Sequence, residues 1–246
     1  MRPASEQTRL RAPVFAAQGI DVFYGTSQIL FGVDITVEEG QTMALLGRNG
    51  AGKSTTLKAI AGIAPPARGG VSVRGVQVAG WKPHSIARAG LGYVPEDRQV
   101  FPEHTVEDNL IIAAKKGPDG QDYWNLQRIY EMFPLLHPLK QRLAGHLSGG
   151  EQQMLTIART LMGNPVGLLL DEPSEGLAPV IVERIGELLR KLRDLGSTVL
   201  LAEQNMHFCL GIATNATIID KGEIVYRDTI EALRANEAIK QKYLAV

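Results

Sequence analysis

Short runs of apolar residues, separated by glycine, proline and charged residues, recur along most of the chain. Their length and their β-branched and aromatic content are typical of strands. We predict strands at residues 14–22, 28–37, 42–46, 71–74, 76–78, 91–94, 166–170, 198–202, 217–220 and 223–226. The pairs Pro65-Pro66 and Gly69-Gly70 interrupt this pattern and predict a break in the chain.

Helical spacing of apolar residues appears in two settings. Between strands it predicts helices at residues 53–60, 83–89 and 179–195, and two short helices follow the last strand. Between residues 105 and 163, helical patterns occur without a convincing strand. The chain is therefore predicted to be an α/β protein with a helical insertion at roughly residues 96–163. Residues 1–13 are expected to form a flexible tail, and residues 14–246 one domain.

Composition narrows the class of protein. Hydrophobic residues make up 44% of the chain and charged residues 21%, as in an ordinary globular protein. The 26 basic and 26 acidic residues cancel, so no global field favours nucleic acid or an anionic membrane, and no nucleic-acid partner is expected. No apolar run approaches the roughly 18 residues of a membrane helix. Any association with a membrane must then come through a partner.

The single cysteine bears on the compartment. Cys209 cannot form an internal disulfide, and this fits a reducing compartment. It lies in an apolar stretch, so we expect a small buried side chain. The N-terminal residues include Arg2, Arg9 and Arg11 but no apolar core like that of a secretory signal.

The most informative polar stretch lies between the predicted strand 42–46 and the helix 53–60. It fits the phosphate-binding pattern G-x-x-x-x-G-K-[ST]. The glycines let backbone N–H groups curl around a phosphate, and the helix N-terminus adds its positive end. Lys53 can reach the β- and γ-phosphates, and the Ser54 hydroxyl can ligate Mg²⁺. The residues predicted to bind ATP are Gly47, Arg48, Asn49, Gly50, Ala51, Gly52, Lys53, Ser54 and Thr55.

Two carboxylates follow another apolar strand. Asp171 and Glu172 come directly after residues 168–170, and ligands of parallel sheets bind beyond the carboxyl ends of strands. If this strand lies near the phosphate loop, Asp171 would hold Mg²⁺, directly or through water. Glu172 would face the attacking water as a general base. A surface Asp-Glu pair is the alternative, and the complete phosphate loop disfavours it.

A third segment, residues 147–153 (Leu-Ser-Gly-Gly-Glu-Gln-Gln), opens a helix that runs to about Gly163. Ser148 is a good N-cap residue. Two successive glycines weaken a helix start unless something must approach the backbone closely. A bare helix N-terminus suits an anion. Because the chain already has a phosphate loop, this second anion site is best explained by a nucleotide held on another subunit.

The order and spacing of residues 47–54, 147–152 and 168–173 resemble the ATP-binding cassette (ABC) ATPases, whose signature is the second segment. The resemblance covers nearly the whole chain after the tail. It implies a P-loop NTPase fold in which the ABC ATPase core carries an N-terminal antiparallel β subdomain and the helical insertion. It also implies that two subunits sandwich two ATP molecules. Each ATP would be capped in trans by the partner's copies of Ser148, Gly149, Gly150 and Glu151.

The resemblance also assigns roles to single positions. Tyr24 matches the aromatic residue that stacks on adenine. Glu96 follows strand 91–94, where the family usually has a glutamine that touches Mg²⁺ or water and lies near the permease. Gln204 replaces the usual switch histidine, and it can donate to the γ-phosphate but cannot carry a proton at neutral pH. Residues 174–179 match the loop that contacts the opposite subunit. With Glu172 and Lys53, the residues Gln204 and Glu96 are expected to be catalytic.

One branch of the family is the most similar. Glu96, the Glu-Gln-Asn run at 203–205 and the Gly-Leu-Ala-Pro run at 176–179 resemble the ATPases of branched-chain, or hydrophobic, amino acid importers. Within it the chain looks like the smaller of two paired ATPase subunits. This implies ATP and Mg²⁺ as cofactors and a location in the cytoplasm, peripheral on the inner face of the cell membrane. The implied partners are transmembrane permease subunits, an extracytoplasmic solute-binding protein, and a second ABC ATPase subunit, paralogue or self, in a head-to-tail dimer.

Other functions stay open at this point. Glu175 resembles the relatives that import urea and short amides, and Asp97 stands where the branched-chain branch usually has glycine. A soluble ABC ATPase that works on DNA, ribosomes or cluster assembly would share the core. Its repair members carry long coiled coils and its translation members are usually tandem, and this chain has neither feature. A regulatory module that closes without turnover is disfavoured by the intact Lys53, Asp171 and Glu172.

Overall fold

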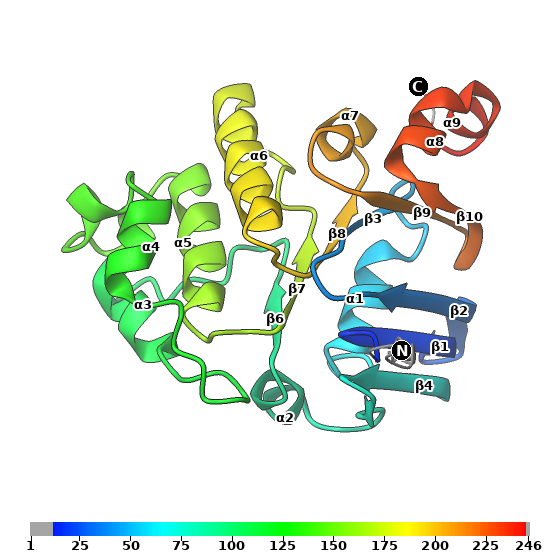
Figure 1. The fold of residues 1–246 in the computed structure, drawn as a ribbon, viewed down its shortest axis with the longest axis horizontal. Coiled ribbons are helices and arrows are strands. Elements are labelled where there is room, and N and C mark those ends of the chain that lie inside the picture. The colour runs from blue at the N-terminus through cyan, green and yellow to red at the C-terminus, as the bar shows by residue number, and fades with distance from the viewer. Residues whose placement is uncertain (1–11, 245–246) are drawn as a thin grey trace, which may run out of the picture.

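The computed structural model describes residues 12–244, which form two sheets (Figure 1). One sheet is antiparallel, with the strand order β2 (Ser27–Val37), β1 (Phe15–Tyr24), β4 (Arg68–Val73) and β5 (Val76–Gln77). The other has the order β10 (Glu223–Thr229), β9 (Asn215–Asp220), β3 (Thr42–Leu46), β8 (Val199–Glu203), β7 (Gly167–Asp171) and β6 (Leu91–Val94). All strands of the second sheet run parallel except β10.

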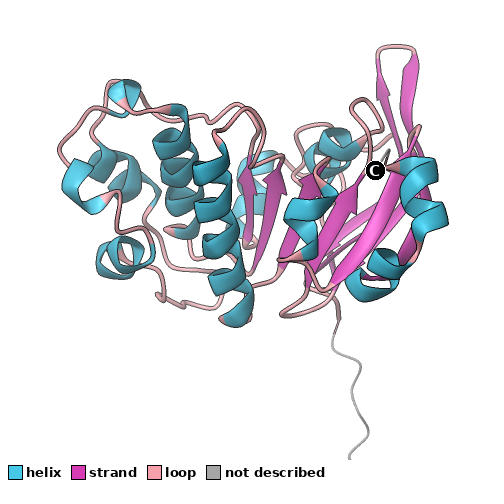
Figure 2. Cartoon of the chain, turned by 90° about the horizontal axis from the view of Figure 1, so that it is seen from above, coloured by secondary structure: helices cyan, strands magenta, loops and turns pink. Residues whose placement is uncertain are grey.

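Helices are unevenly distributed over these sheets. The helices between and after the strands are α1 (Lys53–Ile60), α2 (Pro83–Arg88), α6 (Pro179–Asp194), α7 (Met206–Leu210), α8 (Ile230–Ala235) and α9 (Glu237–Tyr243). Between β6 and β7 the chain forms α3 (Val106–Ala113), α4 (Leu126–Met132) and α5 (Gly149–Leu161), with 3₁₀ turns at His137–Leu139 and Ala144–His146. Seen from above, helices and loops make up one end of the molecule and the strands lie toward the other (Figure 2).

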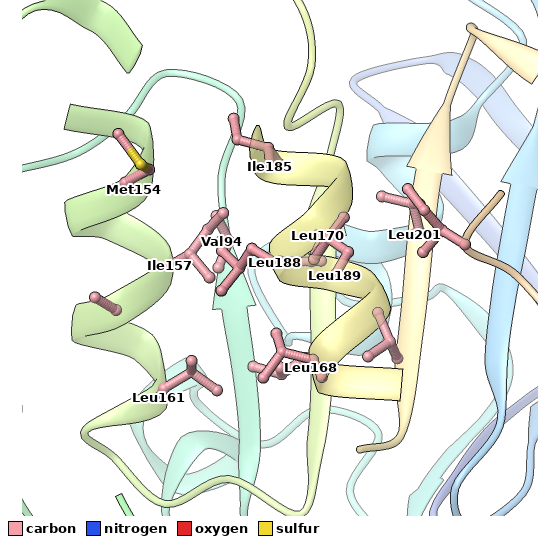
Figure 3. Packing of buried hydrophobic residues seen from close by; sticks show 14 of the residues in the cluster. Val94, Met154, Ile157, Leu161, Leu168, Leu170, Ile185, Leu188, Leu189 and Leu201 are labelled. Carbon is pink, nitrogen blue, oxygen red and sulfur yellow. The ribbon is translucent and has the colours of Figure 1, made fainter. Parts of the chain in front are cut away.

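The central strands are buried on both faces, as is usual for parallel strands. In β3, Ala44 and Leu46 face one core while Met43 and Leu45 face the other. The first core lies between the sheet and helices α5 and α6, where Leu168 and Leu170 of β7 meet Leu188 (Figure 3). Helix α1 lies between the parallel strands and the antiparallel sheet and packs against both. The apolar runs read from the sequence therefore form the strands that hold the phosphate loop.

The α/β fold with an antiparallel subdomain agrees with the prediction, and most predicted elements lie within a few residues of the observed bounds. The break predicted at Gly69-Gly70 is wrong, because β4 begins at Arg68 and contains both glycines. Gly69 has a φ of +83°, and a Cβ there would lie 2.3 Å from the carbonyl oxygen of Gly19. Here glycine allows β4 to approach an irregularity in β1 instead of ending the strand.

The remaining expectations differ in what the structure says of them. Cys209 is fully buried, as predicted. Residues 1–11 of the predicted tail lie outside the described residues, and the insertion bounds of 96–163 stay a prediction. None of the helices within residues 12–244 has the length and apolar character needed to span a bilayer.

Candidate nucleotide-binding site

The carboxyl ends of three parallel strands gather the predicted site. Strands β3, β8 and β7 are neighbours in that order, with Leu46 paired to Glu203 and Asp171 paired to Ala202. Ligands bind outside the carboxyl ends of such sheets. The loop after β3 and the acids at the end of β7 are therefore held at one edge, with β8 between them.

Two glycines of the phosphate loop are required by its surroundings. A Cβ on Gly47 would lie 2.5 Å from the carbonyl oxygen of Ile219. Gly52, the residue before α1, has a φ of +112°, and a Cβ on it would lie 2.8 Å from Cδ2 of Leu30. The loop can take this shape only with glycine at both positions. Its shape leaves the N-terminus of α1 without a side-chain cap.

Lys53 is folded back over the loop. Its Nζ donates to the carbonyl oxygens of Gly47, at 2.9 Å, and Arg48, at 3.1 Å. It also pairs with Oε1 of Glu172 at 3.1 Å, and the two side chains are only 3% and 8% exposed. Removing one member of a buried pair leaves an uncompensated charge, so each group depends on the other. The structure thus brings the predicted phosphate-binding lysine directly to the predicted base.

Asp171 has an incompletely satisfied carboxylate. Its Oδ2 accepts from the hydroxyl of Tyr93 at 3.0 Å, and the nearby side chain of Ser54 favours the charged carboxylate and so acts to lower the pKa of Asp171. Its Oδ1 is buried and has no hydrogen-bond partner among residues 12–244. Burial raises the pKa of Asp171 above its ordinary value. A carboxylate oxygen left open beside a serine hydroxyl suits a hard cation.

These residues fit Mg²⁺. The described part of the chain has no cluster of three or more His, Cys, Asp or Glu side chains able to hold a metal. Mg²⁺ commonly takes only one or two protein ligands and completes its shell with substrate phosphates and water. Ser54 and Asp171 would supply the protein ligands.

Tyr93 is a site residue that the sequence reasoning missed. Burial, followed by the nearby charge of Asp171, raises the pKa of Tyr93, so its hydroxyl remains a donor to that carboxylate. The position could have been found from the register. Tyr93 comes one residue before the end of β6, which pairs with β7 at the level of Leu169.

An acidic cluster surrounds the residues after β7. A hydrogen bond with Glu172 is the largest cause that raises the pKa of Glu175 to about 7, and the charges of Glu96 and Glu203 add to it. Glu203 is buried, and its Oε1 accepts from the backbone N–H of Ser174 at 3.1 Å. Burial raises the pKa of Glu203. Its position in the loop network was also missed from the sequence.

Three predicted residues lie at the margin of the site. Tyr24 ends β1 and is 50% exposed. Glu96 lies after β6, and Gln204 follows β8; both side chains are exposed. Contacts of these residues with adenine, Mg²⁺ and the γ-phosphate stay predictions.

The signature segment belongs to another part of the molecule. Ser148 caps α5, and its hydroxyl and backbone N–H both donate to Oε2 of Glu151. Helix α5 packs on α3 and β6, whereas α1 packs on β7, β8 and the antiparallel strands. The glycines are explained in part by packing, since a Cβ on Gly150 would lie 2.6 Å from Cγ2 of Ile181.

These features together define a P-loop NTPase. A glycine loop joins a parallel strand to a helix, a buried lysine begins that helix, and two acids lie at the end of β7. The family described as "ABC transporter" matches residues 30–175, more than half of the chain. The chain belongs to this family and is the ATP-binding, ATP-hydrolysing subunit of an ABC transporter. Such subunits form dimers and pair with permease subunits.

Individual relatives cover nearly all of the chain. The high-affinity branched-chain amino acid transport ATP-binding protein BraG of Pseudomonas aeruginosa is 41% identical over 226 residues, 92% of this chain and 97% of BraG. The probable branched-chain amino acid transport ATP-binding protein LivF of Archaeoglobus fulgidus is 36% identical, covering 91% and 95%. The lipopolysaccharide export system ATP-binding protein LptB of Escherichia coli is 32% identical, covering 93% and 95%.

A solved structure supports the same fold. The crystal structure of the ADP conformation of an ATP-binding cassette from an ABC transporter superposes with a TM-score of 0.79. It is 25% identical to this chain and covers 93% of this chain and 97% of the other.

Proposed function

We propose that this chain powers the import of branched-chain or related amino acids. It would lie on the inner face of the cell membrane, bound to permease subunits. An extracytoplasmic solute-binding protein would deliver the solute to those permeases. The single observation that carries the solute class is the similarity to BraG and LivF over nearly the full length of each chain, which exceeds the similarity to LptB. The branch-specific residues Glu96 and Gln204 agree with it.

Within one subunit, the geometry supports a division of roles. Lys53 and the loop from Gly47 to Thr55 would hold the phosphates, and Tyr24 would stack on adenine. Ser54 and Asp171, with Glu96 as a further contact, would hold Mg²⁺, which neutralises charge on the phosphate oxygens. The support is the buried Oδ1 of Asp171, which has no hydrogen-bond partner among the described residues, and the nearby Ser54 side chain.

The chemical step would depend on a base. Glu172 would accept a proton from the attacking water, which would have to lie in line with the γ-phosphate. Gln204 would donate to the γ-phosphate without taking up a proton. Glu172 is supported by its buried position and by its ion pair with the loop lysine.

The second half of the site would come from another subunit. In a head-to-tail dimer, the partner's copies of Ser148, Gly149, Gly150 and Glu151 would cap the ATP on this chain's loop. Support comes from the separate packing of α1 and α5 within one chain. Closure would place the γ-phosphate among fixed donors, and hydrolysis would reopen the dimer and reset the permease. The second subunit is either another copy or a paralogue.

Two alternatives share this ATPase chemistry. An importer of urea or short amides is favoured by Glu175, which resembles those relatives. A soluble ABC ATPase without a permease would keep the same nucleotide site. The two differ from the amino acid importer in their partners, so partner identification separates all three.

Affinity isolation of the chain from detergent-solubilised native membranes, with identification of bound proteins by mass spectrometry, tests the proposal. We expect two multi-spanning permeases and a second ATPase. The solute-binding protein encoded with those partners is then assayed for branched-chain amino acids, urea and short amides. Binding of urea or short amides alone would favour the first alternative. Recovery of soluble partners only, or of nucleic acid, would refute the importer.

A further inference from the structure

The guanidinium group of Arg98 lies where three functional segments meet. Arg98 belongs to the turn that follows β6, close to Glu96. Its Nη2 donates to the carbonyl oxygen of Glu175 at 3.0 Å, in the loop predicted to face the partner subunit. A Cβ added to Gly176 in the same loop would lie 3.5 Å from this nitrogen. The turn after β6 thus holds the partner-facing loop through one side chain.

The other nitrogen of the same fork lies against the signature helix. A Cβ added to Gly149 would lie 2.5 Å from Nη1 of Arg98 and 3.4 Å from its Cζ. The Arg98 guanidinium therefore lies close to the backbone of Gly149, the first residue of α5. Any side chain at position 149 would meet the guanidinium, which gives glycine a packing role there.

The backbone around Arg98 is itself constrained. Arg98 has a φ of +51°, a conformation that residues with a Cβ rarely adopt. The turn is tied to α5 as well, because Nη2 of Arg159 donates to the carbonyl oxygen of Gln99. A left-handed arginine held between these segments costs conformational free energy, and the surrounding contacts must maintain it.

We propose that Arg98 is a positioning residue for ATP hydrolysis. It couples the turn after β6 to both partner-facing elements, the loop after Ser174 and the signature helix start at Gly149. The inference rests on the proposed ATP sandwich, because these elements meet the partner's nucleotide only in that dimer. The family resemblance predicts that the turn after β6 lies near the permease. A displacement of that turn would then reach both partner-facing elements through Arg98.

Arginine suits this role for a geometric reason. Its planar fork presents several donors in fixed directions, so one nitrogen can hold a carbonyl while the next lies against a second backbone segment. A lysine ammonium keeps the positive charge but is a single point on a flexible stem. If positive charge alone matters, Arg98→Lys should keep the activity of the wild type. If the fork must contact both segments, Arg98→Lys should lose activity.

The experiment compares the full-length wild type with Arg98→Ala, Arg98→Lys and the control Arg142→Ala, an exposed arginine of the same helical region. Hydrogen exchange of the nucleotide-free proteins is measured first. In Arg98→Ala we expect faster exchange in the peptides covering 148–152 and 174–178 together, with an unchanged Tm. In ATPase assays we expect kcat to fall about tenfold or more, as for a misplaced catalytic geometry, while the KM for ATP stays within about twofold.

The remaining outcomes separate the inference from the proposed function. Arg98→Lys should keep the Tm and fail to restore kcat; full rescue by lysine would show that charge suffices and would overturn the link. Unchanged exchange and kcat in Arg98→Ala would also overturn it. If the wild type bound and hydrolysed no ATP, the proposed function would fail. In that case, faster hydrogen exchange of Arg98→Ala in both peptides would still establish the physical link. Faster exchange in only one of the two peptides would refute it.

Discussion

The phosphate loop and the signature helix start contrast in their surroundings. At the loop, Lys53, Asp171 and Glu172 are buried, and the lysine is already bonded to backbone carbonyls and to a carboxylate. At the signature start, Ser148 is exposed, and within residues 12–244 its hydroxyl group bonds only to Glu151 of its own capping box. One region is a partly desolvated site within a single chain, and the other is a helix start whose first residue after the cap is partly exposed and whose second is packed against α6.

The difference indicates that electrostatic interactions dominate at the phosphate loop and packing dominates at the signature helix start. Charges in a buried site interact strongly because little water screens them, so the loop region can be built before the nucleotide arrives. At the surface, water screens the charges of a capped helix start, so they interact weakly until a partner covers them. Single substitutions at the phosphate-loop site should therefore mainly change turnover and cation binding. Single substitutions in the signature helix start itself should mainly change the stability of the chain and its assembly with a second subunit.

The largest effect is expected for Glu172→Gln. The amide keeps the size of the side chain and can still accept a hydrogen bond from Lys53, so ATP binding should persist. Loss of the base should lower turnover by about 10²- to 10⁴-fold. Phosphate release and nucleotide affinity are measured on the same preparation. Normal turnover would remove Glu172 from the role of base.

Asp171→Asn should separate stability from cation binding. The wild type buries a carboxylate whose Oδ1 has no partner, and the pKa of Asp171 is raised by burial, so the neutral amide should raise the Tm of the nucleotide-free protein. A gain of about 1 kcal/mol corresponds to about 2–4 °C in a chain of this size. The additional Tm increase given by ATP with Mg²⁺ over ATP with a chelator should disappear. A retained Mg²⁺-dependent increase would contradict the cation site.

On the signature side, the two glycines should differ. A Cβ at Gly150 meets Cγ2 of Ile181, a branched side chain in a packed interface, so Gly150→Ala should cost about 1–3 kcal/mol. Adding Ile181→Ala should recover part of this loss by removing the clashing atom. Gly149→Ala meets only the end of the Arg98 side chain and should change the Tm little. Thermal unfolding of the three variants measures these changes. Equal losses of stability for Gly149→Ala and Gly150→Ala would contradict the prediction that the two glycines differ.

The smallest effect concerns pH. The pKa of Glu175 is raised from its ordinary 4.5 to about 7, so the folded chain holds this proton more tightly than the unfolded chain. Its contribution to stability is therefore present below the ordinary value and is lost as the pH rises through about 7. The Tm of wild type should fall relative to Glu175→Gln between about pH 5 and about pH 8. Glu183→Gln, on the exposed face of α6, should follow wild type.

Much of this architecture follows from local sequence. The strands Thr42–Leu46 and Leu91–Val94 have the predicted bounds, because buried parallel strands read as continuous apolar runs. The phosphate loop and the acids after β7 were found because their chemistry requires residue types at fixed spacing. Local rules failed at Gly69-Gly70, where the partner strand decides whether glycine ends or continues a strand.

The missed residues act across segments. Tyr93 reaches Asp171 only because β6 pairs with β7, and Arg98 reaches Glu175 only because two turns meet at one edge of the sheet. The roles of such side chains depend on register and packing, which no single stretch of sequence encodes. Gln204, Tyr24 and Glu96, in contrast, were placed by family resemblance and still need a bound nucleotide to be tested.

The ion pair between Lys53 and Glu172 has a consequence for the order of events in a catalytic cycle. A single ammonium group is available to two anions, so an arriving phosphate and the carboxylate compete for it. If Lys53 binds the nucleotide as proposed, Glu172 would lose its counter-charge and become free to accept a proton. Under this proposal, nucleotide binding and activation of the base would occur in one step. In the nucleotide-free subunit, the same lysine would keep Glu172 paired and inactive as a base.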